Sequence, residues 1–473
     1  MACLPLSFSA RALTTLVAFT LVWPLLRAAE DPWALRDAVL KRIVAPTFPA
    51  RDFVVTKYGA SPLGRFDCRE AFAKAIAECA AAGGGRVVVP GPGMYYVEGP
   101  IHLQSNVNLH VEAGATIVFG VMVEPYLPAV LTRFEGTMLY GHSPRIYARG
   151  ATNVALTGKG TIDGNGRDTL AVMRDSKARG GSGTLRKMGA DGVPVEQRIF
   201  AEGKWMRPSM IQFLECTNVL IEDVKVIDSP FWIIHPVLCR NVTVRGVTVE
   251  SWNGNNDGCD PDSSVDVLIE NCVFRTGDDA IAIKSGRDQD GWKVGQASEN
   301  IVIRNVLMGS RHSGVCIGSE MSGGVRNVWV ENCTVESASS AFYFKANLDR
   351  GGVVENVWAR GMKVAKAREA LVRFGTTYHG YRGGNFPPVF RNFHLTDLEC
   401  EEAPAYGISL DGQAAAPIEN VRLERVKIKK AKEPLWLRHT KELHFEDVEI
   451  NGQKVPVNPP ETPADAKPVK ISA

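Results

Sequence analysis

Four short polar segments in the second half of the chain carry side chains that could do acid–base chemistry. They are Asn255-Asn256-Asp257-Gly258, Thr276-Gly277-Asp278-Asp279, Arg311-His312-Ser313-Gly314 and Tyr343-Phe344-Lys345. Hydrolysis of a glycosidic bond needs two carboxyl groups in different protonation states, one to protonate the leaving oxygen and one to activate water. Crowding of Asp257, Asp278 and Asp279 would raise the pKa of at least one carboxyl and keep a proton on it. We therefore interpret the three aspartates as a candidate hydrolytic cluster.

Each of these segments alone is weak evidence for catalysis. A Gly-Asp-Asp turn is usually only a turn, an isolated histidine is more often structural, and a single lysine is more often solvated surface. The information lies in their recurrence within a repeated unit, because Asp278 and His312 lie equally far beyond the starts of their own repeats. Stacking of the repeats would bring the three carboxylates, His312 and Lys345 together on the outside of the fold.

The repeated unit is usually an asparagine followed by alternating apolar residues, as in Asn218-Val-Leu-Ile-Glu-Asp-Val-Lys-Val226. Copies begin at Asn106, Asn153, Asn218, Asn241, Asp266, Asn300, Asn327, Asn356, Asn392, Asn420 and Glu442. Each copy predicts a β-branched strand whose alternate side chains point inward, and one copy is too short to bury its own apolar face. Valine and isoleucine, not leucine, dominate the inward positions, and the units are too short for propeller blades. The pattern therefore predicts an all-β fold, a right-handed parallel β-helix solenoid.

Other segments bound or interrupt the repeat. Residues 68–82 are alanine-rich with apolar residues at helical spacing, and Gly83-Gly84-Gly85 ends them, so we expect an N-terminal helix that caps the open end of the solenoid. Residues 163–207 are rich in Gly, Lys and Arg and break the period, which predicts a long loop over one face or a disordered insertion. We expect a single catalytic β-helix domain over 30–455 and a loose, Pro-rich C-terminal tail over 456–473.

Residues 1–29 have the features of a signal peptide. The apolar run 12–26 has the length of a signal-peptide core and is short for a bilayer span, and Ala28 and Ala29 supply small residues for cleavage. An uncleaved membrane anchor is the alternative. After cleavage the protein is expected to be secreted or periplasmic, free of the membrane and monomeric. The net charge of +2 gives no strong general attraction to nucleic acid.

The cysteines do not have the spacing of a metal site. Of the 10 cysteines only Cys3 lies in the leader, and the rest are odd in number, so at least one thiol stays unpaired. Cys216 and Cys239 take the same position on adjacent repeats and could form a disulfide, whereas the others favour buried core positions. No Cys-x-x-Cys pair and no Cys/His metal spacing occurs, so the cysteines indicate no metal site. No cofactor is expected.

The four polar segments, the opening helix, the Gly83-Gly84-Gly85 stop and the Asn-apolar repeats together resemble glycoside hydrolase family 28, the polygalacturonase group. The resemblance covers almost the whole chain after the leader. Asn255-Asn256-Asp257 resembles the Asn-Thr-Asp motif of the family, and Asp278-Asp279 matches its Asp-Asp motif. Arg311-His312-Ser313 keeps only the histidine of its Gly-His-Gly motif, and Tyr343-Phe344-Lys345 resembles its Arg-Ile-Lys motif.

This resemblance implies an inverting glycoside hydrolase. Asp278 would be the general acid, and Asp257 and Asp279 would position and deprotonate the attacking water. His312 would tune the protonation of the acid, and Lys345 would hold the carboxylate or hydroxyls of the substrate. Inversion would place the acid and the base about 6.5–9.5 Å apart, with room for the water. No metal is implied.

One departure from the family concerns the sugar next to the cleaved bond. Tyr343 stands where family members use an arginine to grip galacturonate, and a tyrosine can stack on a sugar but cannot form a bidentate pair with a carboxylate. Arg350, Arg311 or the basic loop with Arg186 and Lys187 could compensate; otherwise this subsite would accept a neutral sugar such as rhamnose. The further substrate-binding candidates are Trp232, His235, Asn255 and Tyr378.

The resemblance also implies a substrate class, a galacturonide linkage of pectin, with rhamnogalacturonan or a substituted galacturonan as variants. Exo action is expected because the inserts 163–207 and 287–298 could block one end of a groove. Two alternatives stay open. A calcium-dependent pectate lyase on the same solenoid would use the aspartates as calcium ligands and Lys345 or Arg311 as its base. A non-catalytic carbohydrate-binding solenoid would carry a degenerate site.

Overall fold

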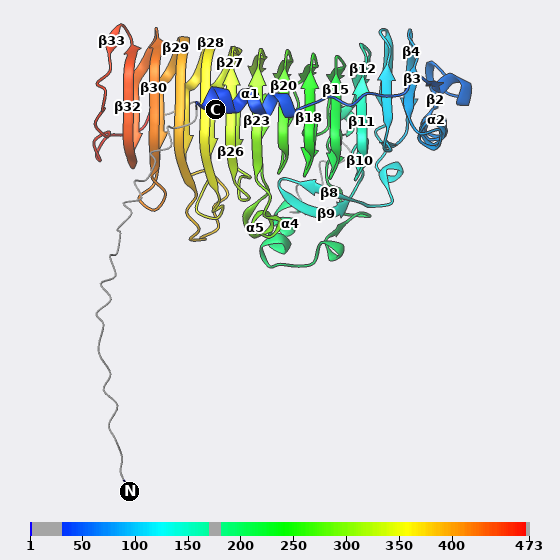
Figure 1. Cartoon of the computed structure of the whole chain (residues 1–473), viewed down its shortest axis with the longest axis horizontal. Coiled ribbons are helices and arrows are strands. Elements are labelled where there is room, and N and C mark those ends of the chain that lie inside the picture. The colour runs from blue at the N-terminus through cyan, green and yellow to red at the C-terminus, as the bar shows by residue number, and fades with distance from the viewer. Residues whose placement is uncertain (2–30, 170–180, 470–473) are drawn as a thin grey trace.

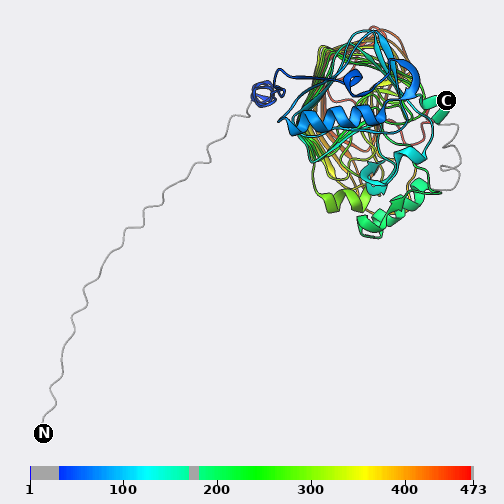
Figure 2. The same ribbon diagram turned by 90° about the vertical axis from the view of Figure 1, so that its right-hand side faces the viewer.

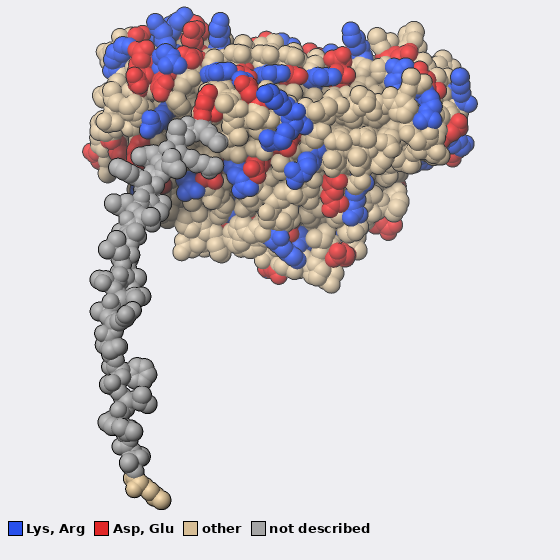
Figure 3. Space-filling view, viewed as in Figure 1, with Lys and Arg blue, Asp and Glu red and all other residues tan. Residues whose placement is uncertain are grey.

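The computed structural model describes residues 1, 31–169 and 181–469. The predicted signal peptide falls on residues 2–29, outside this described part of the chain. Within the described part, no helix is both long and apolar enough to cross a bilayer. Acidic and basic side chains are interspersed on the face seen in Figure 3, in keeping with the net charge of +2.

The chain winds into a right-handed parallel β-helix, which confirms the predicted fold class. Figure 1 shows the coils side by side along the long axis, and Figure 2 looks along that axis. Strands of successive coils pair in parallel and form three rows. The coil is right-handed because the connection between parallel strands of one sheet is almost always right-handed. The first row begins each repeat copy, and the polar segments lie on the third row or in the turns that lead into it.

The first row consists of β1 (Asp52–Val54), β3 (Gly85–Val89), β6 (Val107–Val111), β11 (Thr152–Thr157), β15 (Thr217–Glu222), β18 (Arg240–Arg245), β20 (Val265–Glu270), β23 (Ser298–Arg304), β26 (Val325–Glu331), β28 (Val353–Gly375), β29 (Val389–Asp411), β30 (Ile418–Ile428) and β32 (Thr440–Ile450). The second row consists of β2 (Leu63–Asp67), β4 (Gly93–Val97), β7 (Ala115–Phe119), β12 (Thr161–Asp163), β16 (Lys225–Ile227), β19 (Thr248–Ser251), β21 (Val273–Thr276), β24 (Leu307–Ser310), the first part of β27 (Thr334–Lys345), the middle parts of β28 and β29, and the last parts of β30 and β32. The third row consists of β5 (Ile101–His102), β10 (Ile146–Arg149), β14 (Ile211–Leu214), β17 (Ile234–Val237), β22 (Ile281–Ile283), β25 (Ser313–Gly318), the last parts of β27, β28 and β29, and β31 (Ala431–Arg438).

The start of every predicted repeat copy has left-handed backbone. The eleven residues predicted as starts, from Asn106 to Glu442, have φ between 50° and 64°. Asparagine tolerates this conformation better than other residues that carry a Cβ. The asparagine side chains also bond along the axis: Asn300 Oδ1 accepts a hydrogen bond from Asn327 Nδ2 at 3.1 Å, and Asn327 Oδ1 accepts one from Asn356 at 3.3 Å. The sequence repeat is therefore a ladder of side-chain amides at one corner of the coil.

Asn327→Ala is expected to lower the free energy of unfolding by about 1–3 kcal/mol, because alanine strains the left-handed backbone and removes two ladder bonds. Chemical denaturation followed by circular dichroism measures this loss. Asn327→Gly is the matched control, since glycine keeps the backbone conformation and removes only the side-chain bonds. Equal losses for the two variants would show that the backbone conformation does not explain the asparagine repeat.

Inward side chains of the first row form an apolar ladder through the length of the solenoid. Successive rungs align Val219, Val242, Val267, Ile301, Val328, Val357, Phe393, Val421 and Leu443. Burial of one such side chain stabilises the fold by about 1.5–3 kcal/mol. Stacking of coils thus completes a core that no single repeat could bury.

Both ends of the core are covered. The predicted capping helix is present as α2 (Arg69–Ala81), which crosses the N-terminal end of the solenoid in Figure 2 and buries Phe72, Ile76 and Cys79. At the other end β33 (Gln453–Lys454) pairs antiparallel to β32. The Pro-rich segment was expected to be loose, yet its described part lies against the last coil: Thr462 Oγ1 accepts a hydrogen bond from Leu437 N at 2.9 Å.

A second helix, α1 (Pro32–Arg42), was not predicted. It lies across the outer face of the first row, over β20 and β23, far from the strands that follow it in sequence (Figure 1). Its Val39 packs against an apolar strip formed by Leu268, Val302 and Trp329, which occupy one outward position on consecutive coils. The strip needs a cover because large apolar side chains in a row are costly to leave in water.

The predicted long loop over 163–207 is largely structured where it is described. It contains α4 (Gly181–Ala190), η3 (Val195–Gln197) and β13 (Ile199–Phe200). β13 joins a hairpin of β8 (Val130–Phe134) and β9 (Thr137–Gly141), and α5 (Asp288–Val294) packs beside α4. These inserts gather on one side of the solenoid (Figure 1). Two further short helices are η1 (Val55–Tyr58), which precedes β2, and η2 (Glu124–Tyr126).

The nine described cysteines are all buried and free. The possible disulfide between Cys216 and Cys239 is not formed; each thiol instead donates to a backbone carbonyl, of Leu214 at 3.4 Å and of Phe213 at 3.1 Å. They act as small core residues.

Candidate active site

The polar segments meet on the outer face of the third row. In β22 the side chains of Ile281 and Ile283 enter the core, so Ala282 and Lys284 face outward. A cavity of about 130 Å³ opens above this face. Among its lining residues are most of those predicted from the sequence, namely Trp232, Asn255, Asp257, Asp278, Asp279, Lys345, Arg350 and Tyr378. We call this cavity the cleft.

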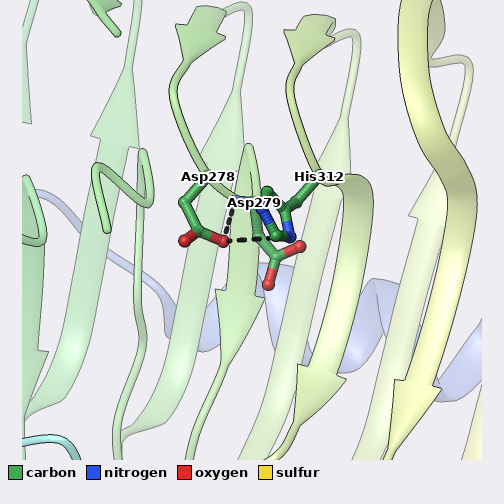
Figure 4. Close-up of side chains that lie close together, drawn as sticks. All are labelled: Asp278, Asp279 and His312. Carbon is green, nitrogen blue, oxygen red and sulfur yellow. Dashed lines mark hydrogen bonds and ion pairs between the residues drawn. The ribbon is translucent and has the colours of Figure 1, made fainter. Parts of the chain in front are cut away.

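Asp278 is the most accessible of the three aspartates. Its Oδ1 accepts a hydrogen bond from Asp279 N–H at 2.9 Å and lies 3.7 Å from Nδ1 of His312, which comes from the next coil (Figure 4). The hydroxyls of Thr276 and Ser310 bond its carbonyl oxygen at 2.7 and 2.6 Å and fix the turn. A fixed, partly exposed carboxyl beside a histidine can exchange a proton with a bound molecule.

Asp279 is fully buried and doubly held. Lys345 Nζ donates to its Oδ2 at 2.8 Å, and Ser313 N–H donates to its Oδ1 at 2.9 Å. Burial alone would raise the pKa of Asp279, but the charges of Lys345 and Lys284 outweigh it and hold the pKa below its usual range. Asp279 is therefore an ionised carboxylate in the free protein.

Asp257 has the opposite electrostatic environment. Its Oδ2 lies 3.6 Å from Lys284 Nζ, and its Oδ1 has no hydrogen-bond partner among the described residues. Burial and the nearby charge of Asp278 raise the pKa of Asp257 well above its usual range. Beneath it Asp260 is also fully buried, and burial together with Asp257 raises its pKa in the same way. The cluster thus combines carboxyls that favour opposite protonation states, the condition for acid–base work.

Lys284 is the main residue that the sequence analysis missed. Its Nζ donates to Gly318 O at 3.0 Å and to Glu320 Oε2 at 3.3 Å, and it lies 4.7 Å above the ring of Trp232. Burial would lower the pKa of Lys284, but Glu320 and the neighbouring aspartates outweigh it and raise the pKa. The alternation of the Ile-Ala-Ile-Lys run could have identified it as an outward residue of the candidate site.

Two predicted substrate-binding residues lie elsewhere. His235 was placed beside the sugar, but its ring is fully buried, with Nδ1 3.0 Å from Gln212 Nε2 and Nε2 3.4 Å from Asp262. It supports Trp232 from below at a ring distance of 4.9 Å, so direct contact with a sugar is excluded in this structure. Arg311 is exposed, lies over Trp252 at 5.8 Å and does not line the cleft.

Of the other predicted residues, Lys345 and Arg350 line the cleft in different roles, whereas Tyr343 does not line it. Lys345 lies 5.3 Å from the ring centres of both Tyr343 and Tyr378, which flank it. Arg350 lines the cleft but is almost fully buried, and its donors are taken by Asp288 at 2.5 Å and by Ser319 O at 2.7 Å. Arg350 therefore supports the wall of the cleft and has little capacity left to bind a carboxylate.

Ion pairs join the β8–β9 hairpin, α4 and the α5 segment beside the cleft. Arg287 of the α5 segment pairs with Glu135 Oε2 at 2.9 Å, and its N–H bonds Gly136 O at 2.9 Å at the tip of the β8–β9 hairpin. Arg186 of α4, predicted as part of a basic loop, pairs with Asp288 at 2.7 Å and Asp349 at 3.0 Å. These buried and partly buried pairs hold three insertions together beside the aspartates.

Asp278, Asp279 and His312 also lie close enough to be weighed as a metal site, with one ligand atom of each within 4.8 Å of the others. Asp279, however, already has an ammonium group at 2.8 Å on one oxygen. A fixed positive charge at that point competes with a cation and suits proton transfer better than metal binding.

Comparisons with known proteins agree with this geometry. Residues 129–442 match the model of the glycosyl hydrolases family 28. A protein of Vitis vinifera named "Probable polygalacturonase" is 29% identical over 329 residues, which cover 67% of this chain and 65% of that protein. The exo-poly-alpha-D-galacturonosidase of Dickeya chrysanthemi is 26% identical over 377 residues, covering 74% of this chain and 62% of that protein. The chain thus spans slightly less than two thirds of these two relatives.

A solved structure matches over a larger share of both chains. The exopolygalacturonase from Thermotoga maritima superposes with a TM-score of 0.83 at 38% identity, covering 88% of this chain and 96% of the other.

Proposed function

The chain belongs to glycosyl hydrolases family 28, and on this premise we propose that it hydrolyses galacturonide linkages of pectin with inversion, acting from one chain end. The observation that supports this most is the meeting of Asp257, Asp278 and Asp279 in one cleft, where the pKa of Asp257 is raised and that of Asp279 is lowered. The predicted leader supports a secreted or periplasmic location. The partner is then a pectic polysaccharide or oligosaccharide, bound by a monomer.

The proposed reaction assigns one role to each aspartate. Asp278 donates its proton to the leaving oxygen as the glycosidic C–O bond breaks. Water held by Asp257 and Asp279 attacks the anomeric carbon, and its proton passes to ionised Asp279. His312, 3.7 Å from Asp278, modulates the proton on the acid. The charges balance without a cofactor, because one carboxyl loses the proton that the other gains.

Lys345 links substrate binding to the base. In the free protein its ammonium group neutralises Asp279 at 2.8 Å. A uronate carboxylate bound in the cleft would share this ammonium group, and the weaker pairing would raise the pKa of Asp279 and make it a better base. An anionic sugar therefore helps to activate its own hydrolysis.

Exo action rests on two observations. Glu135 and Arg287, which belong to the inserts and pair with each other, line one wall of the cleft. The relatives from Thermotoga maritima and Dickeya chrysanthemi carry exo-acting names. A wall of inserts beside the aspartates favours the binding of a chain end over a chain that passes through.

Incubation with polygalacturonate is expected to release monogalacturonate from the earliest time points, while the viscosity of the solution falls little. Mass spectrometry should find one water added for each bond cleaved, and a chelator should leave the rate unchanged. Unsaturated products that absorb in the ultraviolet and need a metal would establish the lyase instead. Binding without turnover on galacturonan or rhamnogalacturonan would establish the carbohydrate-binding solenoid.

A further inference from the structure

A second, larger cavity of about 390 Å³ adjoins the cleft on the side of the later coils. The two cavities share Lys345, Tyr378 and His379, so a molecule in one can continue into the other. Its far wall includes the C-terminal segment, where Val469 N–H bonds the hydroxyl of Tyr406. We call this cavity the leaving-side pocket.

One outward position of the third row runs through the pocket. Parallel pairing aligns Tyr343 with Arg373, Arg373 with Ser409, and Ser409 with Trp436. The alternate residues, such as Val372 and Phe374, enter the core. Arg373 therefore stands where Tyr343 stands, but one coil later.

Arg373 is held in place yet keeps free donors. Its guanidinium lies 4.4 Å above the ring of Tyr343, and it pairs with Glu369. Its side chain is 29% exposed and lines the pocket. Stacking and one ion pair use only part of the five N–H donors of an arginine, which leaves a fork that can bind a carboxylate.

We propose that the leaving-side pocket binds the sugar beyond the cleaved bond, and that Arg373 binds the carboxylate of that sugar above the ring of Tyr343. This inference rests on the proposed function and adds the direction in which the substrate chain runs along the solenoid. Insert residues line one wall of the cleft, and the pocket continues the cleft on the side of the later coils, so we place the remaining chain toward the later coils. The sugar beyond the cleaved bond is then a uronate, and a neutral sugar such as rhamnose is disfavoured there.

The test uses digalacturonate and the same disaccharide methyl-esterified on its reducing-end residue, two substrates that differ in one charge. The wild-type protein should prefer the acid in kcat/KM by about 10- to 100-fold, the usual value of a hydrogen bond to a charged group. Arg373→Ala should remove this preference, and Arg373→Lys should restore part of it, because lysine keeps the charge without the fork. Arg391→Ala is the control and should keep the wild-type preference. Arg391 is an exposed arginine of β29 that pairs with Glu355.

A ratio of rates is insensitive to partial loss of folded protein, so reduced yield of a variant does not mask the result. Retention of the wild-type preference by Arg373→Ala would overturn the proposal, as would a wild-type protein that cleaves both substrates equally well. Failure of the wild-type protein to cleave either disaccharide or polygalacturonate would instead remove the proposed function, and this inference with it.

Discussion

Asp278→Asn is expected to lower kcat on polygalacturonate by about 10²–10⁴-fold, the usual contribution of a positioned acid or base. An asparagine has nearly the shape of the carboxyl group, so the turn held by Thr276 and Ser310 should persist. Only the proton for the leaving oxygen is lost. Reducing-sugar release under initial-rate conditions measures the change.

A comparison of substrates with different leaving groups distinguishes loss of the general acid from a general loss of activity. A phenol leaves without help from an acid, so Asp278→Asn should lose much less activity on an aryl α-galacturonide than on the polymer. Asp279→Asn should lose activity on both, because its proposed role is toward the water. Asp397→Asn is the matched control: Asp397 is exposed, pairs with Arg425, and has a left-handed backbone that asparagine accepts. Equal losses for Asp278→Asn on the two substrates would contradict its assignment as the acid.

Much of the fold could be predicted from the sequence because the coil repeats one local rule. An asparagine in left-handed backbone followed by alternating apolar residues fixes where each strand begins and which side chains enter the core, so one copy explains the others. Spacing within the repeat then brings Asp278 and His312 together. A sequence repeat predicts the local structure of one coil and its stacking on the next coil. These are the main contacts in a solenoid, because each coil contacts only its neighbours.

The rest depends on contacts that no period encodes. Helix α1 covers Leu268, Val302 and Trp329, residues more than two hundred positions away, although their shared outward position already marked an apolar strip. Among outward residues, alternation does not distinguish a side chain that faces a cavity from one covered by an insert. His235 was therefore placed beside the sugar although Trp232 covers it, and Lys284 was passed over although it reaches the cleft.

Lys284→Met is expected to lower the free energy of unfolding by about 3–5 kcal/mol, because removal of one partner from a buried ion pair leaves the other charge without compensation. Lys284 lies among Glu320, Asp257 and Asp260, and Glu320 has an oxygen 3.3 Å from it. Methionine fills much of the same volume, so the lost charge dominates the effect. Urea denaturation at neutral pH measures the loss, and Lys363→Met, at an exposed site on β28, is the matched control.

The pH dependence of this loss identifies its cause. Burial works against ionised Glu320, but Lys284, Arg287 and Arg350 hold its pKa below the usual range, so its contribution to wild-type stability is present above about pH 4.3 and declines as the pH falls further. In Lys284→Met the positive charge that offsets the burial of Glu320 and Asp257 is gone, so the pKa values of both carboxyl groups rise. Protonation then favours the folded variant, so the deficit against wild type should shrink as the pH falls from 7 toward 5. A deficit that stays constant over this range would indicate lost packing instead.

A second substitution tests the same charge balance without a change of pH. Glu320→Gln alone should destabilise the protein, since Lys284 then loses the largest of the charges that offset its burial. In Lys284→Met/Glu320→Gln both members of the pair are neutral, and the combined loss should be smaller than the sum of the single losses by about 0.5–3 kcal/mol. Additive losses would mean that the two side chains stabilise the fold independently. Coupling would show that Lys284 and Glu320 form one balanced charge pair beneath the aspartates, although neither takes part in the proposed proton transfers.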